Sequence, residues 1–252
     1  MKLLTLARDL RRRKARGREG LFAAEGVRTV EELLKSPVTI RGVLVAPQLA
    51  DAPRGASLLD ALRQRGGELA EVSALEFASA AETESPQGVL AVAEIPAWSL
   101  DRLPLESRWR MVLLDGVQDP GNVGTIVRTA AALGAIAVLA MPGTVDLWNA
   151  KVVRSTMGAS FHTPAFACTW AALDAFRSGV PVTLWGADAG GRPLDALDIP
   201  DRLIIAVGNE GSGLSTDARS RVDALASLPI SATVESLNVA VATGILLYQV
   251  RS

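Results

Sequence analysis

Three polar segments of the chain combine glycine, asparagine and ionisable side chains directly after a short apolar run. The first contains Asn122 and carries Arg128 six residues later, the second surrounds Glu210 with glycines, and the third places Ser236 and Asn238 before an apolar stretch. Apolar runs of this kind are typical of buried strands, and ligands bind at the carboxyl ends of strands in open α/β sheets. The three segments are therefore candidates for one ligand-binding site.

The side chains in these segments suit the binding and orientation of a ligand. Asn122 lies near a helix start and Arg128 roughly two turns further in, so that both can reach one ligand, although a capping Asn122 with a surface-exposed Arg128 fits the same pattern. Glu210 can bind a substrate group or orient an arginine, and it can also cap a helix that begins near Ser212. Both polar residues of the third segment are ordinary N-cap residues as well.

Other chemistries find little support in the sequence. A single cysteine, Cys168, and a single histidine, His162, argue against an internal disulfide and against a zinc site, so we expect no metal. No G-x-S-x-G segment provides a hydrolase nucleophile. The spacing of Gly208, Gly211 and Gly213 differs from the dinucleotide fingerprint, which disfavours an oxidoreductase with a nicotinamide cofactor.

The elements expected around these segments form two regions. In the second region, apolar runs and helical periodicity predict a parallel or mostly parallel α/β domain with strands over 111–114, 137–140, 180–185 and 203–207 and helices over 123–133, 149–160 and 239–251. In the first, they predict a small α/β unit with helices over 1–34 and 58–65 and strands over 38–45 and 89–92. We therefore expect a first domain over 1–97, a linker over 98–107 and a second domain over 108–252.

Basic charge is concentrated at the front of the chain. Residues 1–28 carry a net charge of +6, although the whole chain has a net charge of −1. A cluster of this kind binds nucleic-acid phosphates or forms a solvated helix end or a disordered tail. The basic residues in question are Arg11, Arg12, Arg13, Lys14, Arg16 and Arg18.

No stretch of the sequence predicts membrane insertion. Apolar stretches such as 131–142 are too short or too interrupted to cross a bilayer, and no charged-then-apolar signal segment opens the sequence. We therefore expect a cytoplasmic protein that does not associate with a membrane.

Together, the stretches 113–134, 203–214 and 228–248 closely resemble the three motifs of the SpoU-type, or TrmH-like, RNA 2′-O-ribose methyltransferases of the SPOUT superfamily. The resemblance extends from Arg108 to the C-terminus, and the stretch 21–28 resembles the ribosomal-protein-like substrate-binding domain of many such enzymes. It implies an α/β fold with a trefoil-knotted C-terminal domain, a homodimer whose active sites take residues from the partner, and S-adenosylmethionine as the cofactor. Knots are rare exceptions to the usual rules of chain connection.

The same resemblance implies roles for individual residues. Arg128 is the family's candidate base, but a guanidinium is a poor proton acceptor, so it can instead clamp the neighbouring phosphate while Ser236, Glu210 or the phosphate takes the proton. Glu210 and Asn122 would then hold Arg128 in place. The implied catalytic residues are Asn122, Arg128, Glu210, Ser236 and Asn238. The implied cofactor-binding residues are Leu184, Gly186, Gly208, Leu228, Ile230 and Leu237.

The resemblance also gives weight to structured RNA as the partner, because such RNA is held mainly through phosphates and shape. The accessory first domain favours ribosomal RNA over transfer RNA as the substrate. The alternatives are a transfer-RNA 2′-O-methyltransferase and a non-catalytic RNA-binding protein, such as a ribosome assembly factor, with the same fold.

Overall fold

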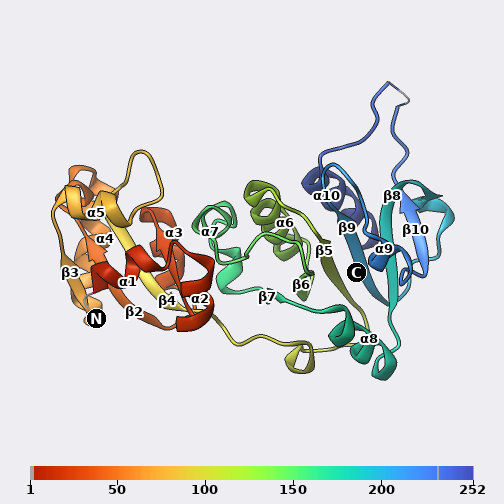
Figure 1. The fold of residues 1–252 in the computed structure, drawn as a ribbon, viewed down its shortest axis with the longest axis horizontal. Coiled ribbons are helices and arrows are strands. Elements are labelled where there is room, and N and C mark those ends of the chain that lie inside the picture. Colours follow the sequence, from red (N-terminus) through yellow and green to blue (C-terminus); the bar gives the residue numbers. More distant parts are fainter. Residues whose placement is uncertain (1–2, 232, 252) are drawn as a thin grey trace. The chain divides into compact units, whose positions relative to one another are not determined.

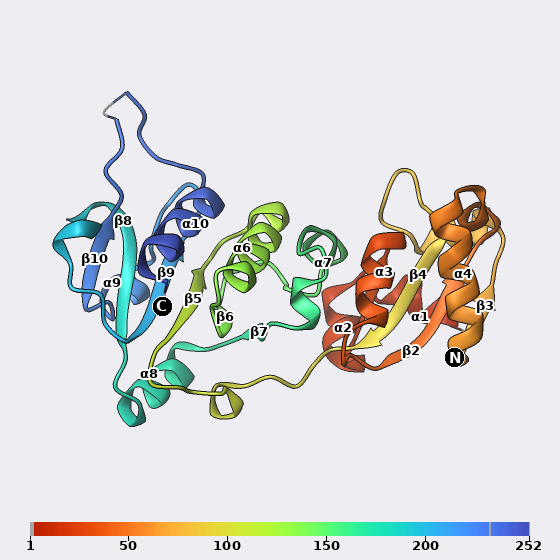
Figure 2. The same ribbon diagram turned by 180° about the vertical axis from the view of Figure 1, so that it is seen from behind.

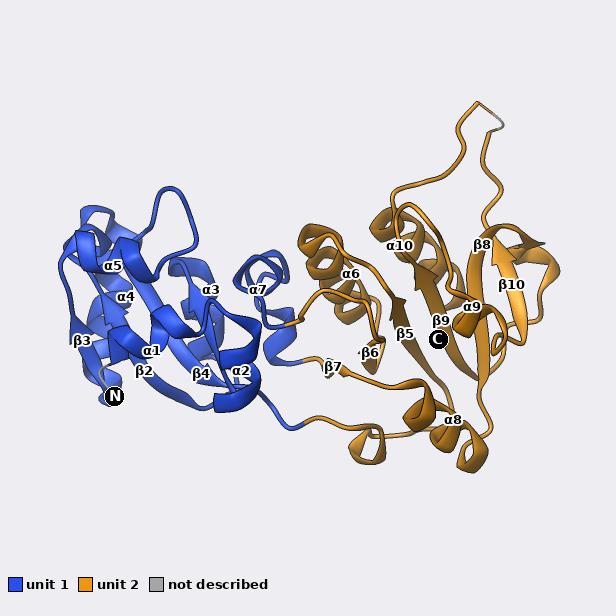
Figure 3. Cartoon of the chain, viewed as in Figure 1, with its two compact units in different colours: residues 1–97, 148–162 blue, residues 98–147, 163–252 orange. Residues whose placement is uncertain are grey.

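The structure is a computed structural model, and it describes residues 3–231 and 233–251. The chain divides into two compact units, one formed by residues 1–97 and 148–162 and the other by residues 98–147 and 163–252 (Figure 3). Each unit has its own β-sheet (Figure 1). None of the helices in the described part of the chain is long and apolar enough to cross a membrane.

Unit 1 is built on a mixed sheet in which β4 pairs antiparallel with both of its neighbours. In spatial order the strands are β1 (Leu21–Glu25), β4 (Val89–Glu94), β2 (Ile40–Val45) and β3 (Leu69–Glu71). Its α-helices are α1 (Leu3–Asp9), α2 (Arg13–Glu19), α3 (Val27–Leu34), α4 (Pro53–Arg65), α5 (Ala74–Ala80) and α7 (Ala150–Ser155), with 3-10 turns η1 (Pro47–Asp51) and η3 (Ala159–Phe161). Buried apolar side chains of α1 and α5, among them Leu3 and Phe77, pack on Leu44 and Leu90 of the sheet.

The helix expected over 1–34 is wrong at its centre, where residues 21–25 form β1. Gly20 ends α2 in the left-handed conformation with φ 65°, and Gly26 has φ 99°, so glycine separates the strand from the helix on either side. Phe22 and Ala24 are fully buried, and the strand pairs along its length with β4. Long-range pairing and burial therefore override the helical periodicity.

Residues 148–162 belong to unit 1, whereas the sequence analysis placed them in the second domain. The ring of Phe22 packs against the rings of Trp148 and Phe161, at centroid distances of 4.5 Å and 5.9 Å. The Arg154 guanidinium lies 3.5 Å from the buried carboxylate of Glu25. These contacts explain the assignment of the segment, which contains α7.

Unit 2 is built on a six-stranded sheet in which every pair of neighbouring strands is parallel, which confirms the expected α/β class. In spatial order the strands are β10 (Ala224–Ser227), β8 (Thr183–Pro193), β9 (Arg202–Gly208), β5 (Trp109–Asp115), β6 (Ala137–Ala140) and β7 (Ala165–Ala167) (Figure 2). The helices are α6 (Pro120–Ala132), α8 (Trp170–Gly179), α9 (Thr216–Arg219) and α10 (Val239–Val250), with 3-10 turns η2 (Leu100–Arg102) and η4 (Leu194–Ala196). The trefoil knot implied by the family resemblance stays a prediction.

Helices cover both faces of this sheet. Leu173 of α8 and Ala218 of α9 join the buried core formed by Met111 and Leu113 of β5. On the other face, α6 and α10 lie side by side (Figures 1 and 2). The buried Arg110 guanidinium ties α10 to the sheet, because its Nε donates to the Val250 carbonyl at 2.6 Å.

Candidate active site

The first two polar segments meet at one edge of the unit 2 sheet. Asp115, the last residue of β5, is paired with Gly208, the last residue of β9, so the loops that follow these adjacent strands begin side by side. The third segment leaves β10, two strands away from β9, and leads into α10, which packs on α6. The topology therefore brings residues far apart in the sequence to the carboxyl edge of the sheet, where ligands bind in open α/β folds.

A chain of hydrogen bonds joins one side chain from each of the three segments. The Asn122 amide Nδ2 donates to Glu210 Oε1 at 3.0 Å, and Asn238 Nδ2 donates to Asn122 Oδ1 at 2.9 Å. Asn122 thus uses its amide nitrogen and its amide oxygen on different partners. The three predicted catalytic residues Asn122, Glu210 and Asn238 form one connected cluster.

The capping residues explain why Asn122 is available for this cluster. Asp119, three residues earlier, is the N-cap of α6 and accepts a hydrogen bond from the Asn122 backbone N–H at 2.8 Å, while Pro120 occupies the first turn. The Asn122 side chain is therefore not the cap. Asn238 does cap α10, since its Oδ1 accepts from Ala240 N at 2.9 Å, and this leaves its Nδ2 for Asn122.

Glu210 is held by the loop that precedes α6. Its carboxylate accepts hydrogen bonds from the backbone N–H groups of Gln118 and Asp119, each at 3.2 Å, in addition to the bond from Asn122. Partial burial acts to raise the pKa of the Glu210 carboxyl, but the hydrogen bonds from Asn122 and from the backbone outweigh it and hold this pKa below its ordinary value. An ionised carboxylate with these partners orients neighbouring groups and is a poor proton acceptor.

Arg128 lies elsewhere on α6. Its side chain is exposed and has no hydrogen-bond or ion-pair partner among residues 3–231 and 233–251. Among the described residues, Glu210 and Asn122 bond to each other and neither bonds to Arg128, so the expectation that they hold Arg128 stays a prediction. Six residues at about 100° each also turn Arg128 to a different side of the helix from Asn122.

Ser236 and the predicted cofactor residues of the third segment lie between β10 and α10. Ser236 is exposed and makes no hydrogen bond to any described residue, so the structure does not join it to the cluster. Leu228, Ile230 and Leu237 are half-buried. The backbone groups of Leu228 and Ile230 make no hydrogen bond within the described ranges, which leaves donors and acceptors beside apolar side chains.

The loop after Gly208 turns back tightly on itself. A Cβ at Gly208 would lie 2.2 Å from the carbonyl carbon of Gly213, so only glycine fits there. Asn209 and Gly213 exchange backbone hydrogen bonds at 3.0 Å and 2.9 Å. The buried carboxylate of Asp115 then fixes the end of the loop, because it accepts from Ser215 N at 2.6 Å and from Ser215 Oγ at 3.0 Å. The sequence analysis missed this use of Asp115.

Two predicted cofactor residues lie inside the sheet. Leu184 is fully buried, its N–H donates to Asp223 Oδ2 at 2.7 Å, and its carbonyl accepts from Asp223 N at 2.8 Å. It pairs with Ile204, four residues before the end of β9, and its role toward the cofactor stays a prediction. Gly186 pairs with Ala206, nearer the edge, and its role stays a prediction.

The part of β8 that reaches the edge is the segment 187–191. It bulges between two stretches of pairing with β10, because Gly186 is opposite Leu225 whereas Arg192 is opposite Ala226. The sequence analysis missed this segment, although the consecutive glycines Gly190 and Gly191 directly after an apolar run were a signal for it.

In unit 1, the basic run resolves into three groups. Arg11, Arg13 and Lys14 are exposed, and no ion pair joins any of them to a described residue. Arg12 and Arg18 are exposed but paired with Asp9 and Glu19. Arg16 is only 4% exposed, and its Nη1 donates to the carbonyls of Leu10 and Arg11 at 2.7 Å and 2.9 Å. The prediction that Arg16 contacts RNA is therefore wrong, because its guanidinium closes the turn between α1 and α2.

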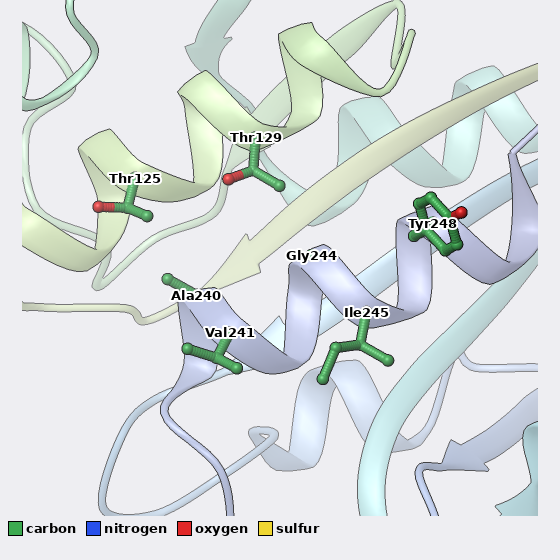
Figure 4. A pocket seen from close by; sticks show the side chains of 7 residues that line it. All are labelled: Thr125, Thr129, Ala240, Val241, Gly244, Ile245 and Tyr248. Carbon is green, nitrogen blue, oxygen red and sulfur yellow. The ribbon is translucent and has the colours of Figure 1, made fainter.

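An apolar groove runs along α6 and α10 (Figure 4). Its volume is about 430 Å³, and it is lined by Thr125, Thr129, Ala240, Val241, Gly244, Ile245 and Tyr248. The side chains of α10 that line it are unusually exposed for apolar residues, with Val241 at 52%, Ile245 at 40% and Tyr248 at 55%. A Cβ at Gly244 would lie 3.3 Å from Thr129 Cγ2, so glycine lets the two helices approach closely.

Two known families match different parts of the chain. Residues 110–248 match the SpoU rRNA Methylase family, and residues 5–91 match the MRM3-like substrate binding domain. The chain is 34% identical to the 23S rRNA (guanosine(2553)-2′-O)-methyltransferase RlmP of Bacillus subtilis, over 97% of this chain and 94% of that protein. It is 32% identical to the 23S rRNA (uridine(2479)-2′-O)-methyltransferase of Streptomyces viridochromogenes, over 94% of this chain and 84% of that protein.

Solved structures share the fold over nearly the full length. The SpoU methyltransferase AviRb of Streptomyces viridochromogenes, in complex with the cofactor AdoMet, matches with a TM-score of 0.88 and 30% identity, covering 99% of this chain and 97% of that chain. The AdoMet-bound rRNA methyltransferase of Sinorhizobium meliloti matches with a TM-score of 0.83 and 28% identity, covering 99% and 94%.

Proposed function

Because this chain belongs to the SpoU rRNA methylase family, we propose that it transfers a methyl group from S-adenosylmethionine to a ribose 2′-oxygen of ribosomal RNA. The observation that carries the proposal is the hydrogen-bonded cluster of Asn122, Glu210 and Asn238, which unites the three family motifs at the carboxyl edge of the sheet. Ribosomal RNA is favoured over transfer RNA because the relatives that match nearly the whole chain are named for 23S rRNA positions.

The residues around this edge fit S-adenosylmethionine. An adenosyl group needs apolar walls and main-chain donors and acceptors, and half-buried Leu228, Ile230 and Leu237 offer apolar surface. The backbone groups of Leu228 and Ile230 are free of hydrogen bonds to the described residues. When bound, the cofactor supplies a methyl group on a sulfonium centre.

The chain's own residues would position the ribose and manage its proton. Methyl transfer forms a bond between the 2′-oxygen and the methyl carbon, breaks the bond between that carbon and sulfur, and releases the hydroxyl proton. Asn122, Asn238 and Glu210 fix one another, and a fixed geometry of this kind lowers the barrier by holding reactants in line. The lowered pKa of Glu210 suits this carboxylate to orienting the site. The proton released from the 2′-hydroxyl would pass to solvent water, with the exposed Ser236 hydroxyl able to relay it.

Arg128 would bind the phosphate beside the target ribose. A guanidinium offers planar paired donors that suit a phosphate, and it is protonated at neutral pH. The exposed Arg128 side chain is free for such a ligand. In this role it stabilises negative charge that develops on the 2′-oxygen during transfer.

The assembly we propose is a homodimer. The exposed apolar side chains of Val241, Ile245 and Tyr248 give α10 a face that suits a second copy of the chain, packed across α6 and α10. In such a dimer Arg128, which has no partner in its own chain, would lie on a helix of the interface and be able to serve the partner's site.

The test measures cofactor binding first and methyl transfer second. Calorimetry with S-adenosylmethionine should give a saturable isotherm, and labelled methyl groups should pass to ribosomal RNA at a 2′-oxygen that is unmodified in cells without the protein. Labelling confined to transfer RNA would favour the transfer-RNA enzyme. No transfer to any cellular RNA would favour the non-catalytic RNA-binding protein and overturn the proposal.

A further inference from the structure

We propose that Asp188 and Arg219 form a positioning pair that fixes the segment 187–191 against the loop 208–214, so that the two together hold the cofactor. The inference rests on the proposed function, since it assumes that S-adenosylmethionine binds at this edge of the sheet. Neither residue was among the sequence-predicted site residues.

The segment 187–191 lies in β8, between the two strands that lead to the proposed cofactor residues. Strand β8 lies between β9 and β10, and the cofactor residues proposed above follow those two outer strands, at Gly208 and at Leu228 and Ile230. Gly186 pairs with Ala206, so the bulge begins level with the end of β9 at Gly208. A ligand that touches both outer loops must therefore also meet the bulge of the strand between them.

Close packing holds the bulge, and backbone hydrogen bonds close the loop 208–214. A Cβ at Gly191 would lie 2.7 Å from the Leu225 carbonyl carbon, and Ser227 Oγ donates to the Gly191 carbonyl at 3.0 Å, so the bulge is packed tightly on β10. The loop 208–214 is closed by the backbone bonds between Asn209 and Gly213.

The Arg219 side chain links the bulge to the loop 208–214. Arg219 Nη2 donates to Asp188 Oδ2, and Arg219 Nε donates to the Leu214 carbonyl at 3.3 Å. Asp188 Oδ1 accepts from Gly190 N at 2.9 Å. One guanidinium thus bonds to both loops, and the Asp188 side chain is only 21% exposed. The pair therefore sets the spacing between the bulge and the loop 208–214.

The Asp188 carboxylate keeps its charge at neutral pH. Burial acts to raise the pKa of the Asp188 carboxyl, but the hydrogen bonds from Gly190 and Arg219 and the charge of Arg219 hold it below its ordinary value. Asp188 is therefore ionised when the enzyme works. A change of pH within the neutral range should leave the link intact.

The test compares binding of S-adenosylmethionine by calorimetry in the full chain and in the variants Asp188→Asn, Arg219→Gln and the charge swap Asp188→Arg with Arg219→Asp. Each single variant should raise the Kd by about fivefold or more, as expected for the loss of one ion pair of about 1 kcal/mol, and the swap should recover part of the loss. At saturating cofactor, kcat and the KM for RNA should stay within about twofold of the parent chain.

The control variants are Asp174→Asn and Arg221→Gln. These two residues form an ion pair that joins α8 to the segment after α9. Its loss should leave the Kd for S-adenosylmethionine unchanged.

The outcomes separate the pair from the proposed function. If the parent chain binds S-adenosylmethionine and both single variants bind it equally well, the pair has no positioning role. The same conclusion holds if the control variants lose as much affinity as the test variants, because the effect is then general destabilisation. If the parent chain itself binds no S-adenosylmethionine, the proposed function fails and the inference fails with it.

Discussion

The side-chain amide of Asn122 makes hydrogen bonds to two different residues, Glu210 and Asn238. Its Nδ2 donates to Glu210 and its Oδ1 accepts from Asn238, so Asn122 joins the other two side chains of the cluster. The cluster therefore acts as a rigid support. Arg128, which has no partner among the described residues of its own chain, keeps the proposed role of binding RNA, either in its own site or in that of a second copy.

We therefore predict a division of labour between Arg128 and the cofactor pocket. Arg128→Ala should lower kcat for methyl transfer by about 100-fold or more, because it removes a charge that stabilises the transition state, while the Kd for S-adenosylmethionine changes by less than about twofold. Single-turnover kinetics and calorimetry measure the two quantities. The control is Arg202→Ala, at the amino end of β9 and the opposite edge of the sheet. Equal losses of transfer and of cofactor binding would contradict the assignment.

The lowered pKa of Glu210 predicts how the cluster responds to acid. A carboxyl whose pKa is lower in the folded chain than in the unfolded chain stabilises the fold above its unfolded pKa, and that stabilisation is lost as the pH falls through the folded pKa. The parent chain should therefore be more stable than Glu210→Gln at pH 7, and the difference should shrink below about pH 4, near and under the ordinary glutamate pKa. Urea unfolding of both proteins from pH 3 to 7 measures this. A difference that stays constant with pH would show that the charge of Glu210 is unimportant.

Arg16 carries a stability prediction. Arg16→Ala should lower the free energy of unfolding by about 2 kcal/mol, because it leaves the Leu10 and Arg11 carbonyls without their charged donor. The matched control is Arg13→Ala, whose side chain is exposed and without an ion-pair partner in the described part of the chain. Urea unfolding curves compare the two variants, and similar midpoints would argue against the buried role.

At the scale of elements, the sequence predicts the parallel sheet of unit 2 well because its strands are buried on both faces. All seven residues of β5 are buried, which is why 111–114 stands out as an apolar run. The sequence predicts β1 badly because the helical spacing on either side of it continues through a segment that forms a strand only by pairing with β4. The bulge of β8 is hidden for a similar reason, since its position depends on the register with β10.

The same limit applies to the candidate site. The sequence predicts Asn122, Glu210 and Asn238 as neighbours because they lie at the ends of predicted elements in three motifs, and the structure joins them by hydrogen bonds. Asp115 and the pair of Asp188 and Arg219 were missed because their partners are distant in the sequence, and only the folded chain brings Asp115 to Ser215. Arg16 was misassigned because its charge suggests solvent, whereas the turn between α1 and α2 buries it.

The α6 and α10 face carries a prediction about assembly. Ile245→Asp places a charge in the apolar groove, so it should convert a dimer to a monomer and reduce methyl transfer. Each chain should remain folded, because Ile245 is already 40% exposed. Sedimentation velocity measures the mass and circular dichroism the fold. The control Leu75→Asp changes an apolar residue of unit 1 that is 84% exposed. A parent chain that sediments as a monomer would contradict the proposed homodimer.

At the scale of the whole molecule, the two units differ in charge and in the ligand each is suited to bind. Unit 2 contains the cluster of Asn122, Glu210 and Asn238 and the loops proposed for the cofactor, whereas the net charge of +6 on residues 1–28 lies in unit 1. The match of residues 5–91 to a substrate binding domain agrees with this separation. Changes to the basic run of unit 1 should therefore alter RNA affinity without altering cofactor affinity.

The salt dependence of RNA binding tests this separation. Replacing Arg11, Arg13 and Lys14 by glutamine should weaken RNA binding and reduce the slope of log Kd against log salt by about 2, because each lost phosphate contact lowers the slope by roughly 0.7 to 0.9. The Kd for S-adenosylmethionine should not change. The control replaces Arg41, Arg54 and Arg63 by glutamine. These changes remove the same amount of charge from unit 1, but the three arginines are paired with Glu94, Glu31 and Glu71. Filter binding between 50 and 300 mM salt, roughly the range over which phosphate contacts dominate, measures the slopes. Equal slopes in the two triple variants would mean that RNA binding responds to the overall charge of unit 1. An unchanged slope in the variant of Arg11, Arg13 and Lys14 would mean that the basic run is a solvated surface that does not contact RNA.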